Sequence, residues 1–167
     1  FQRGAADALN VVVPHGEGPR PLLTVITRGS PLGEGGKALP DVSQTWDWDG
    51  AESALADCRD SLLVTEMFGA ASPPTERWSA MSGVVAEILR LTHPLVLSWP
   101  QSQRVGDPTF FSADDLDGLI NVRYFNIAND PGTMVMDTLG LHVFRLPDVQ
   151  CHFRDRKPGE IAEMLFA

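Results

Sequence analysis

The side chains that could carry chemistry gather in one stretch of this chain, Leu119–Phe153. Four of them, within eleven residues, are of types that bind zinc: His142, Asp148, Cys151 and His152. Their spacing matches no zinc signature, and the alternation of a regular strand sends Cys151 and His152 to opposite faces. We therefore predict no bound metal and no cofactor, and we interpret the histidines as surface or capped residues.

Nucleophilic catalysis has few candidates in this sequence. Cys58 falls on the apolar face of a predicted helix, where a thiol keeps a high pKa and reacts poorly. Cys151 has His152 beside it in sequence but pointing away from it. The motif G-x-S-x-G does not occur. A small hydrolase or a metal-dependent enzyme that uses Asp or His groups near the central strands stays open as the alternative function.

Asp137 is the third chemical candidate, because it follows an apolar run and could sit at a sheet end with a perturbed pKa. Arg123 or Arg145 could be its partner, and Asp148 is nearby in sequence. The simpler interpretation is that Asp137 caps the turn at residues 138–140.

A functional pocket, if one exists, is expected where the ends of Leu119–Ile127 and Met134–Met136 meet the turn Asp137–Gly140. The predicted binding residues are Asp137, Thr138, Arg123 and Trp99. Trp99 is included as the nearest aromatic candidate.

Alternating apolar residues predict that Leu119–Met136 is a β-hairpin, with its turn at residues 129–132. Leu141–Leu146 and residues 149–153 alternate in the same way and predict two further strands. The strands predicted earlier in the chain are Asn10–Val13, Leu22–Thr27, Ser61–Phe68 and Leu95–Trp99. The Gly-rich segment Gly29–Pro40 lacks the spacing of a phosphate-binding loop, so we predict a surface loop without nucleotide.

Two helices are predicted in the first half of the chain. Asp49 with Glu52 three residues later forms a capping-box pattern at the start of the first. Trp46 and Trp48 are interpreted as packing that helix start onto the sheet, rather than as a ligand platform. The longest predicted helix runs from Thr75 to about Leu91 with helical apolar spacing.

Ser112 with Asp115 predicts a short capped helix. Asp114, Asp115 and Asp117 resemble half of a calcium loop but lack its Gly at position 6 and its Glu at position 12. A helix N-terminus that favours acidic charge explains them without metal. Pro158–Phe166 predicts a closing helix. Its inward residues are predicted to be Ile161, Met164 and Leu165.

These elements predict one α+β domain over residues 1–167, with a mixed or largely antiparallel sheet and helices packed mainly on one face. Residues 1–20 could be a poorly ordered lead-in. The predicted core consists of Leu23, Val25, Leu63, Val85, Leu89, Leu97, Val122, Phe125, Val135, Val143 and Val149.

The composition is that of a globular protein, with 43% hydrophobic and 21% charged residues among 167. Its formal net charge of −9 argues against binding nucleic acid or anionic membranes. No apolar run approaches the roughly 20 residues that span a bilayer. Cys58 and Cys151 fit the buried, reduced thiols of a cytoplasmic protein. Because the chain begins with Phe1, we expect that an upstream segment was processed, cut away or left out.

Three motifs carry a resemblance to a known family: residues 121–125 (NVRYF), 134–141 (MVMDTLGL) and 146–150 (LPDVQ). Together they resemble the signature of a bacterial family called domain of unknown function 4261. The resemblance covers roughly the second half of the chain, with residues 85–160 as the family-like part. It implies a bacterial α+β domain and brings no activity with it.

Because each catalytic arrangement falls short, we predict a bacterial accessory or binding domain located in the cytoplasm. The predicted partner is a protein or a small ligand. We predict that it binds no nucleotide, no nucleic acid and no membrane.

Overall fold

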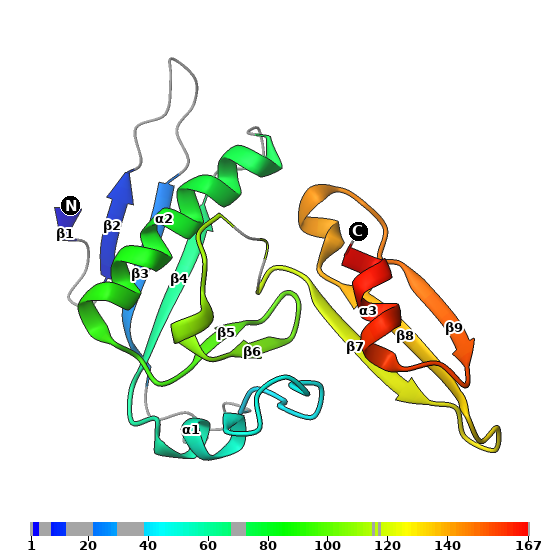
Figure 1. Ribbon diagram of the computed structural model, residues 1–167. Helices are drawn as coiled ribbons and strands as arrows, with labels where there is room; N and C mark the ends of the chain where they lie inside the picture. Colours follow the sequence, from blue (N-terminus) through cyan, green and yellow to red (C-terminus); the bar gives the residue numbers. More distant parts are fainter. Residues whose placement is uncertain are drawn as a thin grey trace.

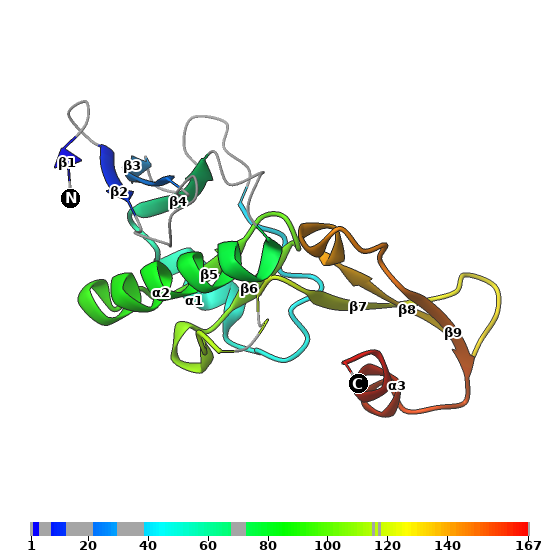
Figure 2. The ribbon, with the colours of Figure 1, turned by 90° about the horizontal axis from the view of Figure 1, so that it is seen from above.

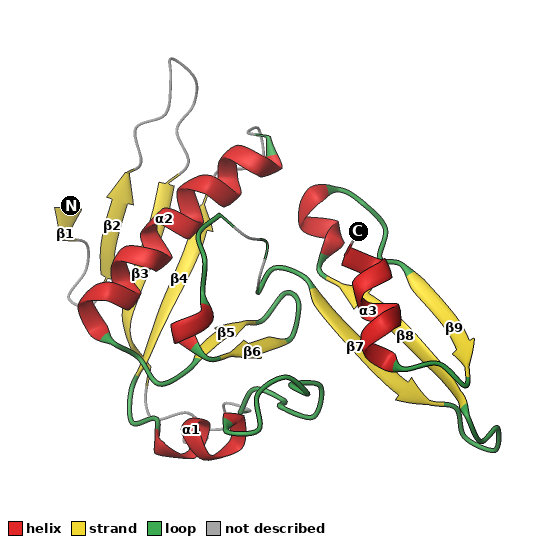
Figure 3. Cartoon of the chain, in the orientation of Figure 1, coloured by secondary structure: helices red, strands yellow, loops and turns green. Residues whose placement is uncertain are grey.

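The computed structural model describes residues 2–3, 8–12, 22–29, 39–67, 73–114, 116 and 118–166. Within these residues, helices and antiparallel sheets form an α+β fold (Figures 1 and 3), which confirms the predicted fold class. The middle of the predicted Gly-rich loop, residues 30–38, lies outside the described residues. None of the helices in the described part combines the length and the apolar character that a membrane crossing requires.

The first sheet has the order β1-β2-β3-β4 and is antiparallel throughout. Its strands are β1 (Gln2–Arg3), β2 (Ala8–Val12), β3 (Leu22–Gly29) and β4 (Ser61–Met67). The long helix α2 (Pro74–Thr92) lies across one face of this sheet (Figures 1 and 2). An ion pair between Arg77 of α2 and Glu66 of β4, at 2.7 Å, joins the two elements.

The elements outside the first and the last sheet, apart from α2 and α3, are short. Helix α1 (Ala51–Asp57) precedes β4, and the hairpin of β5 (Leu97–Trp99) and β6 (Arg104–Gly106) follows α2. A single turn of 3-10 helix, η2 (Pro108–Phe110), comes next. The strand predicted for Leu95–Trp99 is confirmed as β5, although it begins two residues later, at Leu97. Strand β6 was not predicted from the sequence.

The last sheet consists of β7 (Asn121–Asn126), β8 (Thr133–Leu139) and β9 (Gln150–Arg154), in that order and antiparallel. Helix α3 (Pro158–Phe166) covers one face of it (Figures 1 and 2). The core between them is formed by Val122, Met136, Phe153, Ile161 and Ala162. The predicted hairpin, the β9 strand and the closing helix are confirmed here.

The segment that follows β8 corrects one prediction. Leu141–Phe144 forms a 3-10 helix, η3, and not the strand predicted for Leu141–Leu146. Gly140 has a φ of 120°, and a Cβ there would lie 1.9 Å from the Leu119 carbonyl oxygen, so only glycine fits the close approach. The backbone leaves the sheet at Gly140. The alternating apolar residues that follow, Leu141–Leu146, therefore do not pair as a strand.

Two predicted helix starts are wrong. The N-cap of α1 is Gly50, without a side-chain hydrogen bond, so Asp49 is not the cap. Around Ser112 the described residues form turns, and the Ser112 hydroxyl accepts from the Asp114 amide at 3.3 Å. Asp115 and Asp117 lie outside the described residues.

The core predictions were partly correct. Val85 and Val122 are buried, and Leu89, Leu97, Val135 and Val143 are half-buried. Leu63, Phe125 and Val149 are exposed, because the sheet faces or ends they occupy are not covered within the described residues. In α3, Met164 is exposed, and Ala162 takes the buried position beside Ile161. The side chains of Leu23 and Val25 lie outside the described part of the structure.

Candidate functional site

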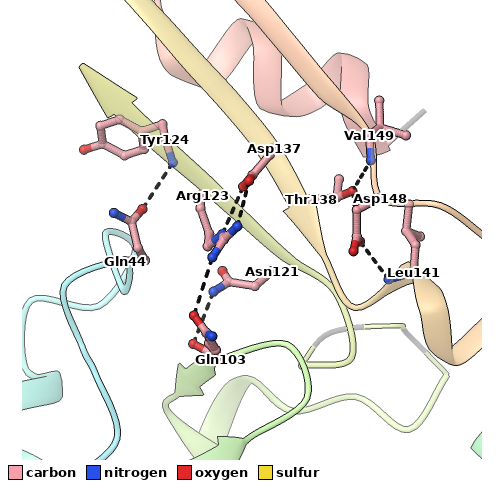
Figure 4. A network of polar contacts seen from close by, with 10 residues as sticks. All are labelled: Gln44, Gln103, Asn121, Arg123, Tyr124, Asp137, Thr138, Leu141, Asp148 and Val149. Atoms are coloured by element: carbon pink, nitrogen blue, oxygen red, sulfur yellow. Dashed lines mark hydrogen bonds and ion pairs between the residues drawn. The ribbon is translucent and has the colours of Figure 1, made fainter. Parts of the chain in front are cut away.

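Arg123 and Asp137 face each other across β7 and β8 as directly paired residues. The Arg123 guanidinium donates from Nε to Asp137 Oδ1 at 2.9 Å and from Nη2 to Asp137 Oδ2 at 2.7 Å (Figure 4). The two side chains are only 20% and 22% exposed, so this bidentate pair is partly shielded from water. The interpretation that Asp137 caps a turn is wrong, because β8 continues through Leu139 and the carboxylate bonds to Arg123.

The surroundings hold the Arg123 side chain in one place. Its guanidinium carbon lies 5.5 Å from the centroid of the Phe125 ring, a cation–π contact. Its Nη1 atom is 3.5 Å from Gln103 Oε1, at the limit of a hydrogen bond. The hydrogen bond to Asp137 raises the pKa of Arg123, although partial burial acts in the opposite direction. Arg123 is therefore a fixed cation whose charge is balanced by Asp137.

These residues belong to one face of the sheet. Register pairs Arg123 with Asp137 and Asp137 with Gln150, while Phe125 pairs with Val135 and Val135 with His152. Because paired residues project to the same side, their side chains form a continuous patch on the side of the sheet opposite α3. We call it the Arg123 face and define it by Arg123, Phe125, Val135, Asp137, Gln150 and His152.

Thr138 follows Asp137 on the strand and projects to the opposite face. It is buried, and its hydroxyl accepts from the Val149 amide at 2.8 Å and lies 3.4 Å from Asp148 Oδ1. Asp148 also accepts from the Leu141 amide at 3.0 Å (Figure 4). Asp148, rather than Asp137, is thus the carboxylate that caps the turn after β8. The structure does not bring Thr138 to the same surface as Asp137.

Trp99, the predicted aromatic residue of the site, belongs to a separate cluster. Its ring lies 5.5 Å from Trp78 and 6.2 Å from Phe111, centroid to centroid. The adjoining pocket measures about 40 Å³. It is lined by Leu97, Trp99, Arg104, Gly106, Phe110, Phe111 and Gly118. The Arg104 side chain is in turn bound by Asp47 in a bidentate ion pair.

Cys151 and His152, two of the side chains considered as zinc ligands, are placed as strand alternation requires. Cys151 packs against the core under α3, whereas His152 is exposed on the other face. Across the described residues, no three His, Cys, Asp or Glu side chains converge as a metal-ligand set. Cys58 is the C-cap of α1 rather than a mid-helix residue, and burial raises the pKa of its thiol, with Asp57 adding to the effect.

The sequence offered no signal for two residues that complete the site, Gln44 and Gln103. Gln44 Oε1 accepts from the Tyr124 amide at 3.1 Å, and the Gln103 carbonyl accepts from the Asn121 side chain at 3.2 Å (Figure 4). Trp46 donates from its indole nitrogen to the Val122 carbonyl at 2.9 Å and meets Tyr124 edge to face. Trp46 thus has the predicted packing role, and the strand that it packs against is β7.

Among known proteins, no family model, no curated protein and no solved structure matches this chain. The site's own geometry is therefore the evidence on function.

Proposed function

We propose that this protein is a non-catalytic binding module, a bacterial accessory domain of the cytoplasm, whose partner is another protein. The observation that supports this most is the Arg123 face, where a fixed guanidinium lies over an exposed aromatic ring. The bacterial assignment rests on the motif resemblance of the second half of the chain alone.

The composition of the Arg123 face favours a protein partner. Arginine and aromatic residues are enriched at protein interfaces and supply many of their energetic hot spots. Phe125 is 41% exposed, and Gln150 and His152 contribute exposed polar groups on the β9 side of this face. Because Asp137 already orders Arg123, a partner would not have to fix that long side chain on binding.

A small-molecule ligand or substrate has less support. The pocket beside Trp99, at about 40 Å³, is far below the roughly 300–1,000 Å³ of typical ligand pockets. Asp137 is a poor general base, because both of its carboxylate oxygens accept from Arg123. Asp148 is likewise bound, to the Leu141 amide and the Thr138 hydroxyl. These contacts therefore do not support the alternative of a small hydrolase.

The test is affinity capture from the native host with wild-type protein and Phe125→Ala, followed by direct binding of the purified partner. Loss of an exposed interface aromatic should weaken binding by about 1–2 kcal/mol, or roughly 5- to 30-fold in Kd. Phe110→Ala is the matched control, because Phe110 is 79% exposed beside the Trp99 pocket and outside the Arg123 face.

The proposal fails if a direct partner binds Phe125→Ala as tightly as wild type. Selective loss with Phe110→Ala would move the binding site to the Trp99 pocket. Unchanged thermal unfolding of both variants would show that the comparison reports binding and not folding.

A further inference from the structure

The outer edge of β9 presents backbone groups that the sheet does not use. The Thr138 amide donates to the Val149 carbonyl at 2.9 Å, and the Asp155 amide donates to the Gly132 carbonyl at 3.2 Å. These bonds set the phase of the ladder between β8 and β9, in which alternate residues of β9 point toward β8. The residues that direct their N–H and C=O groups outward are therefore Gln150, His152 and Arg154.

Nothing in the described part of the chain pairs with this edge. The sheet order ends at β9, and Figure 1 shows α3 in front of β7 and β8 rather than beyond β9. The Cys151 thiol, 3.8 Å from the His152 carbonyl, is a weak donor from within the strand itself. An unpaired strand edge is a template for another strand.

We propose that β9 of one copy pairs antiparallel with β9 of a second copy, about a twofold axis that passes beside His152. The axis is perpendicular to the sheet, so α3 of both copies lies on the same face. His152 then opposes His152 of the second copy, and Gln150 opposes Arg154. Each outward residue exchanges both of its backbone hydrogen bonds, and one sheet continues through both copies.

The order of residues in β9 fits this pairing. Its pattern of polar and apolar side chains, Gln-Cys-His-Phe-Arg, reads the same in both directions. Cys151 opposes Phe153 of the second copy on the face covered by α3, where a sulfur–aromatic contact extends the apolar core. On the Arg123 face, the Gln150 amide meets the Arg154 guanidinium, which is also paired with Asp130 of its own copy, so no two arginines stand opposite each other.

Other registers of the same strand fit less well. A twofold axis beside Arg154 would oppose two guanidinium groups, and like charges in that position destabilise a pair. An axis beside Gln150 would leave Arg154 without a β9 residue opposite it. A shift of the pairing by one residue would place the apolar side chains of one copy on the same face as the polar side chains of the other. The register centred on His152 is the one that uses the whole strand.

Register-specific disulfide formation tests the proposal. In a background of Cys58→Ser and Cys151→Val, His152→Cys should give a disulfide-linked dimer on mild oxidation, because paired Cα atoms lie about 5.5 Å apart. Gln150→Cys is the matched control, since its two copies would lie about 13 Å apart along the strands. Equal or greater cross-linking of Gln150→Cys would overturn the proposed register.

Charge substitution at the same position separates association from folding. Gln150→Arg should raise the dimer Kd about 2- to 30-fold through repulsion by Arg154 of the second copy, and Gln150→Glu should lower it. Within one copy Gln150 pairs with Asp137, so monomer stability should change in the opposite direction, with Arg favourable and Glu unfavourable. Sedimentation velocity gives the Kd, and thermal unfolding of dilute protein gives stability. A wild-type chain that stays monomeric at every concentration, or Kd values that shift in the same direction, would overturn the proposal.

Discussion

At its β7 edge, the last sheet is closed by side chains that stand in for a neighbouring strand. Trp46 donates to the Val122 carbonyl, and Gln44 accepts from the Tyr124 amide. The hydrogen bond from the Ile127 amide to the Thr133 carbonyl shows that Val122 and Tyr124 are outward-facing residues of β7. At the β9 edge, the corresponding outward groups of Gln150, His152 and Arg154 have no such cover among the described residues.

The difference shows two ways of treating a strand edge in one small sheet. The β7 edge is blocked against strand addition, because Gln44 and Trp46, from a loop far away in sequence, occupy its outward backbone groups. At the β9 edge, the features that oppose strand addition are its exposed polar side chains and its short length of five residues. This asymmetry is why we place self-association at β9 and not at β7.

Removing the cap of β7 should have the largest effect. Trp46→Ala removes an indole hydrogen bond and an edge-to-face contact with Tyr124, which together should lower the free energy of unfolding by about 2 kcal/mol. It should also allow association through β7. Denaturant unfolding and light scattering measure the two effects.

Trp46→Phe is the control for that experiment, because it keeps a ring against Tyr124 and loses the N–H donor. It should cost about 1 kcal/mol. If Trp46→Ala is as stable and as monodisperse as wild type, the cap has no protective role.

A smaller effect is expected where β9 begins. Thr138→Val removes the oxygen that accepts from the Val149 amide, at a cost of about 1 kcal/mol. Thr138→Ser keeps that oxygen, so it should keep the Val149 hydrogen bond while losing about 0.8 kcal/mol with the buried methyl group. Hydrogen exchange at the Val149 amide should accelerate in the valine variant alone, and equal exchange in both variants would mean that this bond does not anchor β9.

The smallest effect is expected for the ion pair of the Arg123 face. A double-mutant cycle with Arg123→Met and Asp137→Asn should give a coupling energy of about 0.5–1 kcal/mol, because the pair is partly shielded but still reaches solvent. The coupling should fall as salt is raised, since the exposed part of the interaction is screened. Zero coupling at low salt would show that Arg123 is not held by Asp137 in solution.

Local patterns were sufficient for several elements around the site. The hairpin of β7 and β8, the strand β9 and the helix α3 follow from apolar periodicity and from Pro and Gly at the breaks. Opposite orientations for Cys151 and His152 follow from strand alternation alone. These features depend on residues close together in the chain.

The sequence alone thus determined the α+β class, the second-half strands and helix, and Arg123 as a candidate partner of Asp137. Only the tertiary structure decided which carboxylate caps the turn, that Trp99 belongs to another cluster, and that β7 is capped while β9 is open. The hydrogen bonds that cap β7 join residues far apart in the sequence. Trp46 and Val122 are separated by 76 positions, and Gln44 and Tyr124 by 80. No periodicity connects residues so distant, because their contact depends on how the whole chain packs.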